Sequence, residues 1–126
     1  MNLNNAGIYI HIPFCRSKCP YCDFYSLLLD EDSADAYTDA LLRRIPALAS
    51  RYGVSADTIY LGGGTPSALG AERIARIVGA AREFAGKGAE ITVECNPFDA
   101  AKRGSISPCS RRRASTGYPW ECSRQT

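Results

Sequence analysis

Residues 7–24, GIYIHIPFCRSKCPYCDF, decide how the rest of this chain is interpreted. The stretch begins with β-branched and aromatic residues, and Pro13 stops ladder pairing, so we expect a strand that ends near this proline. The second half carries Cys15, Cys19 and Cys22 in a C-x3-C-x2-C pattern. The three cysteines are therefore expected on a loop that leaves the carboxyl end of the strand.

The cysteine spacing leaves three kinds of site open. Three thiolates on one short loop can hold three irons of a four-iron cluster and leave the fourth iron open to a small molecule. A structural zinc site usually needs four ligands, and His11 is a candidate for the fourth, although a hydrogen-bonded core histidine is the simpler interpretation. A disulfide framework is disfavoured, because the first residues do not resemble a signal peptide. The spacing alone favours an iron–sulfur site.

Composition limits the class of protein. The 126 residues suffice for one small domain with a core. No apolar run approaches the roughly 18 residues that a membrane span needs, and we expect a reducing, cytoplasmic compartment. The net charge of +2 is uneven: residues 1–101 hold 9 Lys/Arg and 12 Asp/Glu, or −3, whereas residues 102–126 hold 6 Lys/Arg and one acid, or +5. Such a basic tail often binds nucleic acid.

The segment after the cysteine loop predicts a helix. Residues 30–33, DEDS, form a helix-start signal with acids where the helix dipole favours them. Residues 34–50 carry apolar side chains at helical spacing. Pro46 lies inside this segment and should kink or end the helix, because it lacks an amide and clashes with the preceding turn. Gly53 is the expected C-terminal stop.

The remaining elements complete an alternating pattern. Residues 57–61 predict a second strand, residues 70–85 a second helix that ends at the Gly-Lys-Gly of residues 86–88, and residues 90–94 a third strand. The order strand, helix, strand, helix, strand suits right-handed crossovers and a parallel sheet. The chain is therefore expected to be an α/β protein.

Chemically useful residues follow each predicted strand. The cysteine loop follows the first strand, the Gly-Gly-Gly-Thr of residues 62–65 follows the second, and Glu94 ends the third. Alone, the glycines are explained by a tight turn and Glu94 by an exposed strand-end charge. In parallel α/β folds, however, ligands lie at the carboxyl ends of the strands. Because three motifs share that edge, we expect them to form one site.

Three motifs together carry a family resemblance: YIHIPFC at residues 9–15 with the two later cysteines, GGGTP at residues 62–66, and VECNP at residues 93–97. Over roughly residues 7–99 the chain resembles the radical S-adenosylmethionine (SAM) proteins of the oxygen-independent coproporphyrinogen III oxidase type. The resemblance implies a partial (β/α)6 barrel. Residues 1–101 would supply its N-terminal part, with three parallel strands and two helices.

The resemblance also implies two cofactors. A [4Fe-4S] cluster would be held by Cys15, Cys19 and Cys22, and its open iron would take the amino and carboxylate groups of SAM. Tyr9 would lie beside this cofactor, and Tyr21 would pack near the adenine. In the family, one electron from the cluster cleaves the sulfonium to a 5′-deoxyadenosyl radical, which abstracts hydrogen from substrate. No residue of this chain is assigned a catalytic role of its own.

Four further residues are implied as cofactor contacts. Gly63, Gly64 and Thr65 would contact the methionine end through backbone and hydroxyl, and Glu94 would bind polar groups of the cofactor. The chemistry is consistent, because glycine backbone permits close approach and a carboxylate suits an ammonium or ribose hydroxyls.

Phe24 separates two branches of this family. The oxidases resemble C-x3-C-x2-C-x-C, with a further cysteine at the position that Phe24 occupies here. The sequence therefore resembles the oxidase-like branch of haem chaperones, which bind haem and deliver it to acceptor proteins. The alternative activity is oxidation of coproporphyrinogen in porphyrin biosynthesis. The expected partners are accordingly SAM, haem or a porphyrinogen, and a haem-acceptor protein, with haem as a further ligand.

The last residues depart from the family. Residues 102–126 show neither helical nor strand periodicity, and their composition is typical of disorder. The family instead continues with a segment resembling AGVNRLSMGVQS. Codons can be chosen for residues 114–124 so that the neighbouring reading frame, across the ten consecutive junctions between these residues, encodes VNRLSMGVQS. We therefore predict a frameshifted, irregular tail after about residue 101, in the genome or as a sequencing error. Its basic charge would be an accident of frame, so no nucleic-acid partner is expected.

An incomplete barrel has consequences for activity. An open sheet edge and uncovered surfaces predict that the 126-residue chain alone is poorly stable and inactive, even if its cysteines bind a cluster. A different class of function, a small non-enzymatic iron–sulfur or zinc module, stays open from the cysteines alone.

Overall fold

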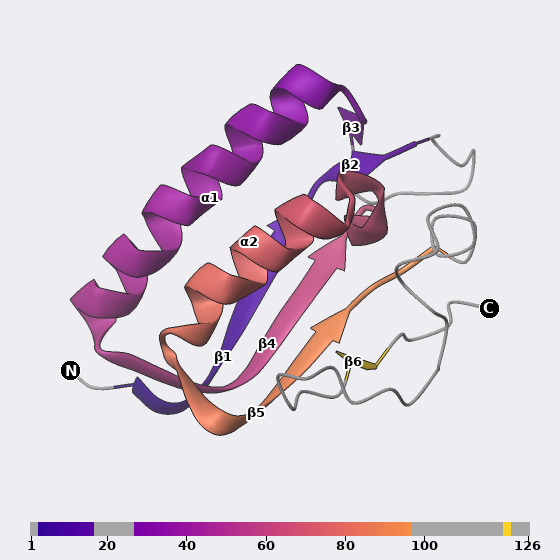
Figure 1. Cartoon of the computed structure of the whole chain (residues 1–126). Coiled ribbons are helices and arrows are strands. Elements are labelled where there is room, and N and C mark those ends of the chain that lie inside the picture. The colour runs from indigo at the N-terminus through magenta and orange to yellow at the C-terminus, as the bar shows by residue number, and fades with distance from the viewer. Residues whose placement is uncertain (1–2, 17–26, 97–119, 122–126) are drawn as a thin grey trace.

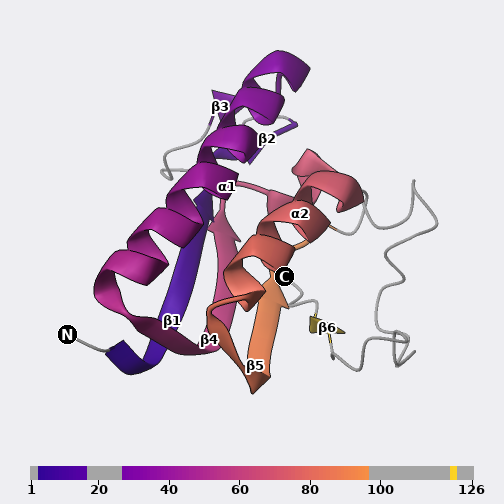
Figure 2. The same cartoon turned by 60° about the vertical axis from the view of Figure 1, so that its left-hand side comes forward.

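A parallel sheet with two helices on one face forms the body of the protein (Figure 1; Figure 2). The structure, a computed structural model, describes residues 3–16, 27–96 and 120–121. The strand order of the sheet is β1-β4-β5-β6, and all pairs are parallel. The elements of this layer are β1 (Leu3–Ile12), α1 (Glu31–Tyr52), β4 (Val54–Gly63), α2 (Ala71–Arg82), β5 (Ala85–Val93) and β6 (Trp120–Glu121). The predicted α/β class, with its three consecutive parallel strands and two helices, is confirmed.

Three short elements lie at the carboxyl edge of the sheet. Strand β2 (Phe14–Cys15) pairs in parallel with β3 (Leu27–Leu28), and a 3-10 helix, η1 (Pro66–Leu69), follows β4. The backbone amide of Leu29 donates to the carbonyl of Cys15 at 2.8 Å, which extends this small ladder. Cys15 is therefore held on a paired strand rather than on a free loop.

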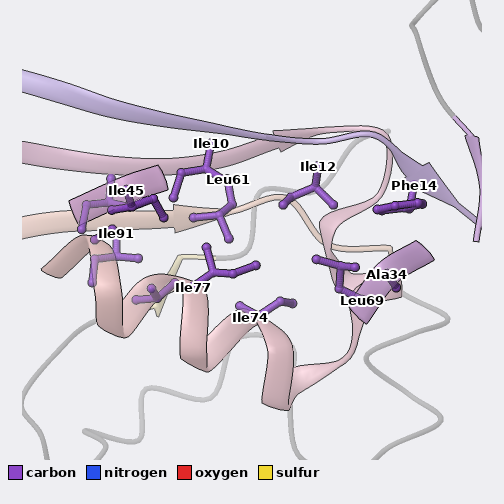
Figure 3. Packing of buried hydrophobic residues seen from close by; sticks show 13 residues of the cluster. Ile10, Ile12, Phe14, Ala34, Ile45, Leu61, Leu69, Ile74, Ile77 and Ile91 are labelled. Carbon is purple, nitrogen blue, oxygen red and sulfur yellow. The ribbon is translucent and has the colours of Figure 1, made fainter. Parts of the chain in front are cut away.

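The core lies between the sheet and the helices. Ile12, Leu61 and Ile77 are each fully buried, and Figure 3 shows side chains of β1 and β4 pointing toward α2. The period of two along a strand places alternate residues on the same face. Ile10 and Ile12 of β1 therefore share the helix-covered face, whereas Tyr9 and His11 lie on the opposite, open face.

Helix α1 begins and ends as its sequence predicts but does not stop at Pro46. The carboxylate of Asp30 accepts from the backbone amide of Ser33 at 3.1 Å, and Gly53 adopts the left-handed conformation at the C-terminus with φ 57°. The hydroxyl of Ser33 also donates to this carboxylate, and the hydrogen bonds from the hydroxyl and then the amide of Ser33 lower the pKa of Asp30. The helix continues through Pro46 to Tyr52, so of the two expected outcomes, a kink or an end, the helix end is wrong. Burial of residues on both sides of the proline, within a helix that packs on the core, outweighs the missing hydrogen bond.

Several boundaries differ from the sequence prediction. Helix α2 ends at Arg82, before the Gly-Lys-Gly of residues 86–88, because the chain turns early to pair with β4. The carbonyl of Phe84, in that turn, accepts from the backbone amide of Ala56 in β4 at 2.9 Å. Strands β4 and β5 start earlier than the apolar pattern suggests, at Val54 and Ala85, since parallel pairing with a neighbour extends beyond the buried residues. The ends of a helix or strand are its least predictable parts.

Of the tail, the structure describes only residues 120–121, which form one short strand. Strand β6 pairs in parallel with β5, so that Ile91 lies opposite Trp120 and Thr92 opposite Glu121. The tail predicted to be irregular thus contains this two-residue strand, because the exposed edge of β5 offers hydrogen-bonding groups to any extended segment. None of the helices in the part of the chain that the structure describes is long and apolar enough to cross a membrane.

Candidate functional site

The carboxyl ends of three parallel strands meet at one edge of the sheet. The backbone amide of Gly64 donates to the carbonyl of Ile12 at 2.8 Å, which joins the end of β4 to the end of β1. The backbone amide of Glu94 donates to the carbonyl of Leu61 at 3.0 Å, which joins the end of β5 to β4. The regions around Cys15, the glycine turn (residues 62–65, which start in the last residues of β4) and Glu94 therefore lie side by side, as the topology predicts.

Cys15 lies directly against the glycine turn. Its Sγ is 3.5 Å from Oγ1 of Thr65, and the backbone amide of Thr65 donates to the carbonyl of Phe14 at 2.7 Å. A Cβ added at Gly64 would lie 3.0 Å from this Sγ and 2.6 Å from the Phe14 carbonyl oxygen. Only glycine therefore allows the turn to approach the cysteine this closely. Cys15 is partly buried and is not in a disulfide.

Gly63 makes room for a different neighbour, His11. Its φ of +119° is a backbone conformation that residues with a Cβ rarely adopt. A Cβ there would also lie 2.7 Å from Cε1 of His11 and 2.9 Å from the Ile12 carbonyl oxygen. The His11 ring therefore packs over the turn, and both the space and the φ angle require glycine at this position.

The carboxylate of Glu94 is hydrogen-bonded through both oxygens. Oε1 accepts from the hydroxyl of Tyr60 at 2.7 Å, and Oε2 accepts from the backbone amide of Gly63 at 3.3 Å. The hydrogen bond to Glu94, followed by desolvation, raises the pKa of Tyr60. A carboxylate has further acceptor positions beside these two hydrogen bonds, so Glu94 is suited to bind a cation or hydroxyl groups.

Tyr9 occupies the open face of the sheet beside this cluster. Its side chain is 60% exposed, and its ring stacks on Tyr60 with 5.9 Å between centroids and 23° between planes. Its hydroxyl lies 3.2 Å from Nδ1 of His11. His11 is thus hydrogen-bonded, as predicted, but it lies on the open face and outside the core cluster.

The structure brings together six of the nine predicted site residues: Tyr9, Cys15, Gly63, Gly64, Thr65 and Glu94. The other three, Cys19, Tyr21 and Cys22, lie outside the described residues. Within residues 3–16, 27–96 and 120–121, no three His, Cys, Asp or Glu side chains come together as a metal site.

Sequence reasoning did not assign Tyr60 to the site. A signal existed, because Tyr60 lies two residues before Gly62 and therefore on the same face of the strand. In the parallel register it is also the direct partner of Tyr9.

Comparison with known proteins defines the class. The model of the radical SAM superfamily matches residues 9–103. The chain belongs to this superfamily, which implies a [4Fe-4S] cluster and SAM as cofactors.

Individual relatives show which proteins of the superfamily the chain resembles. The chain is 43% identical to the heme chaperone HemW of Escherichia coli K12, over 77% of this chain and 27% of that protein. It is 38% identical to the anaerobilin synthase of Escherichia coli O157:H7, over 87% of this chain and 26% of that protein. The solved structure of coproporphyrinogen III oxidase (HemN) from Escherichia coli, a radical SAM enzyme, matches with a TM-score of 0.67 and 32% identity, over 76% of this chain and 23% of that one. The chain thus spans about a quarter of the length of these relatives.

The described residues fit the implied cofactors. Cys15 presents a sulfur beside a glycine rather than beneath a side chain, and Thr65 offers a hydroxyl at the same place. Glu94 supplies a carboxylate held at the adjacent strand end. A thiol for iron and a carboxylate for an ammonium or ribose are the donor types that a cluster and SAM require.

Proposed function

We propose that this chain is the N-terminal part of a radical SAM protein of the haem chaperone type. The proposed ligands of a [4Fe-4S] cluster are Cys15, Cys19 and Cys22. The observation that carries the proposal is the contact of Cys15 with Gly64 and Thr65 at the edge where Glu94 is held. Together, cluster and SAM supply one-electron chemistry at a sulfonium.

The remaining site residues bind and orient the cofactor in this proposal. Gly63 and Gly64 contact the methionine end through their backbone, which carries no Cβ, and Thr65 contacts it through its hydroxyl. Glu94 accepts hydrogen bonds from an ammonium or from ribose hydroxyls. Tyr9 covers the cofactor with its exposed ring, and Tyr21 packs near the adenine.

Haem is the proposed cargo. The support is Phe24, at the position of the oxidases' additional cysteine, together with similarity to proteins named heme chaperones. A haem-acceptor protein is the proposed partner, and the cytoplasm is the proposed location, because reducing conditions keep the thiols available. The alternative is coproporphyrinogen oxidation, supported by similarity to proteins with that name.

Iron and sulfide analysis of the anaerobically purified and reconstituted chain tests the cluster. We expect about four irons and four sulfides per chain, with broad absorbance in the visible region. Cys15→Ala should lose the absorbance, whereas Cys95→Ala, a matched control at the end of β5, should keep it. Zinc in place of iron, or a full cluster in Cys15→Ala, would contradict the proposal and favour a small metal-binding module.

An anaerobic turnover assay tests the oxidase alternative. The reconstituted chain is incubated with coproporphyrinogen, SAM and a reductant, and the product is compared with a control without protein. We expect no product above the control. Turnover would instead establish the oxidase alternative and contradict the chaperone function.

A further inference from the structure

Tyr60 connects the two side chains that are expected to contact SAM on the open face of the sheet. Its ring stacks on the ring of Tyr9, with 5.9 Å between centroids, and its hydroxyl donates to Oε1 of Glu94 at 2.7 Å. We propose that Tyr60 is a positioning residue that holds Tyr9 and Glu94 in the arrangement that binds SAM. This inference rests on the proposed function of the site.

The contact with Tyr60 fixes the carboxylate of Glu94. With Oε1 hydrogen-bonded to Tyr60 and Oε2 to the backbone amide of Gly63, the group is held from two sides. An ionised carboxylate has about four acceptor positions, so two donors leave capacity for an ammonium or for ribose hydroxyls. Two fixed donors reduce the rotamer freedom that binding would otherwise have to remove.

The first glycine of the turn provides the space for this contact. A Cβ added at Gly62 would lie 2.7 Å from Cε1 of Tyr60 and 3.2 Å from Oε1 of Glu94. The ring of Tyr60 can therefore lie along its own strand toward the strand end only because Gly62 has no side chain. Each glycine of the turn thus leaves space for a different neighbour, because it has no Cβ. Gly62 leaves space for Tyr60, Gly63 for His11 and Gly64 for Cys15.

Tyr60 contributes little to the hydrophobic core. It is partly exposed, and it lies on the face opposite to Ile59 and Leu61, its neighbours in the strand, which are buried at 1% and 0% exposure. Removal of its hydroxyl should therefore spare the fold and act on the position of Glu94. This separation allows the positioning role to be measured.

A double-mutant cycle on the full, anaerobically reconstituted chain provides the test. The dissociation constant of SAM is measured by equilibrium dialysis for the unmodified chain, Tyr60→Phe, Glu94→Gln and the double variant. We expect Tyr60→Phe to weaken binding about tenfold, and to have no further effect once Glu94 is Gln. Tyr52→Phe, an exposed tyrosine at the end of α1, should leave the affinity unchanged. Unchanged affinity in Tyr60→Phe, or additive losses in the double variant, would overturn the inference.

A second readout does not depend on SAM. The chain is labelled with tyrosine carrying 13C at Cζ, and the resonance of Tyr60 is identified by its absence in Tyr60→Phe. We expect the titration midpoint of Tyr60 to fall in Glu94→Gln, and an unchanged midpoint would overturn the inference. If the unmodified chain binds no SAM, the proposed function fails, and the midpoint alone then decides whether Tyr60 holds Glu94.

Discussion

The two faces of the central sheet are made by the same strands but from different residue types. The face that packs on α1 and α2 is aliphatic, and Ile12 and Leu61 there are completely buried. The open face carries Tyr9, Tyr60 and Glu94, joined by ring stacking and a hydrogen bond. Because neighbouring residues of a strand point to opposite faces, each strand can stabilise the fold with one set and bind a ligand with the other. Substitutions on the two faces should therefore separate stability from binding.

The largest effect is expected from a buried residue of the helix-covered face. Leu61→Ala removes a side chain with no exposed area, and we expect it to lower the free energy of unfolding by about 2–5 kcal/mol. Urea denaturation followed by circular dichroism measures the change. Thr58→Ala, on the open face of the same strand, should change it by less than about 0.5 kcal/mol. Equal losses in the two variants would contradict the division between the faces.

The second effect concerns binding on the open face. Glu94→Gln removes the charge that, in the proposed function, attracts an ammonium. We expect the affinity for SAM to fall by about 10–100-fold, which corresponds to roughly 1.5–3 kcal/mol. The urea midpoint should stay close to that of the unmodified chain, because Glu94 lies outside the core cluster. Glu90→Gln, an exposed position on the same face of β5, is the matched control and should bind normally. A similar loss in both variants would indicate a general charge effect rather than a site.

Local patterns were sufficient to predict much of this arrangement. The order of strands and helices followed from apolar periodicity, and the shared edge of Cys15, the glycine turn and Glu94 followed from the geometry of parallel sheets. Helix α1 was predicted with its start signal at residues 30–33 and its stop at Gly53, since both signals are local. The sequence also carried family motifs specific enough to indicate the cofactors.

Features that depend on contacts between distant residues were not predicted. The passage of α1 through Pro46 depends on packing against the core. The β2–β3 pair and the strand at Trp120 depend on which backbone happens to lie alongside. The role of Tyr60 depends on Glu94, which is 34 positions later in the chain. Spacing along one segment contains none of this information.

The third effect compares two glycines. Gly63→Ala forces a Cβ against the His11 ring at a φ of +119°, and we expect a loss of about 1–3 kcal/mol in the free energy of unfolding. Gly79→Ala lies in α2 with no atom within 4 Å of the added Cβ, and the same substitution there should stabilise the chain by about 0.5–1 kcal/mol. Urea denaturation measures both, and stabilisation by Gly63→Ala would show that the turn does not require glycine.

The smallest effect is a pH dependence that belongs to the open face. The hydrogen bond to Glu94 raises the pKa of Tyr60 above its ordinary value of 10.0, with desolvation as a further cause. Folding therefore favours the protonated phenol, and this contribution to stability is complete below about pH 10 and is lost as the pH rises through the folded-state pKa. We expect the free energy of unfolding to decline above pH 10, and to decline less steeply in Tyr60→Phe.

The alkaline decline will not vanish in Tyr60→Phe, because burial also raises the pKa of Tyr37, whose hydroxyl donates to the carbonyl of His11. The informative quantity is thus the difference between the unmodified chain and the variant, measured by urea denaturation at a series of alkaline pH values. Tyr52→Phe should reproduce the decline of the unmodified chain. If Tyr60→Phe declined as steeply, its hydroxyl would not be bound to Glu94 in solution, and the open face would lack the link between its two strands that the structure gives it.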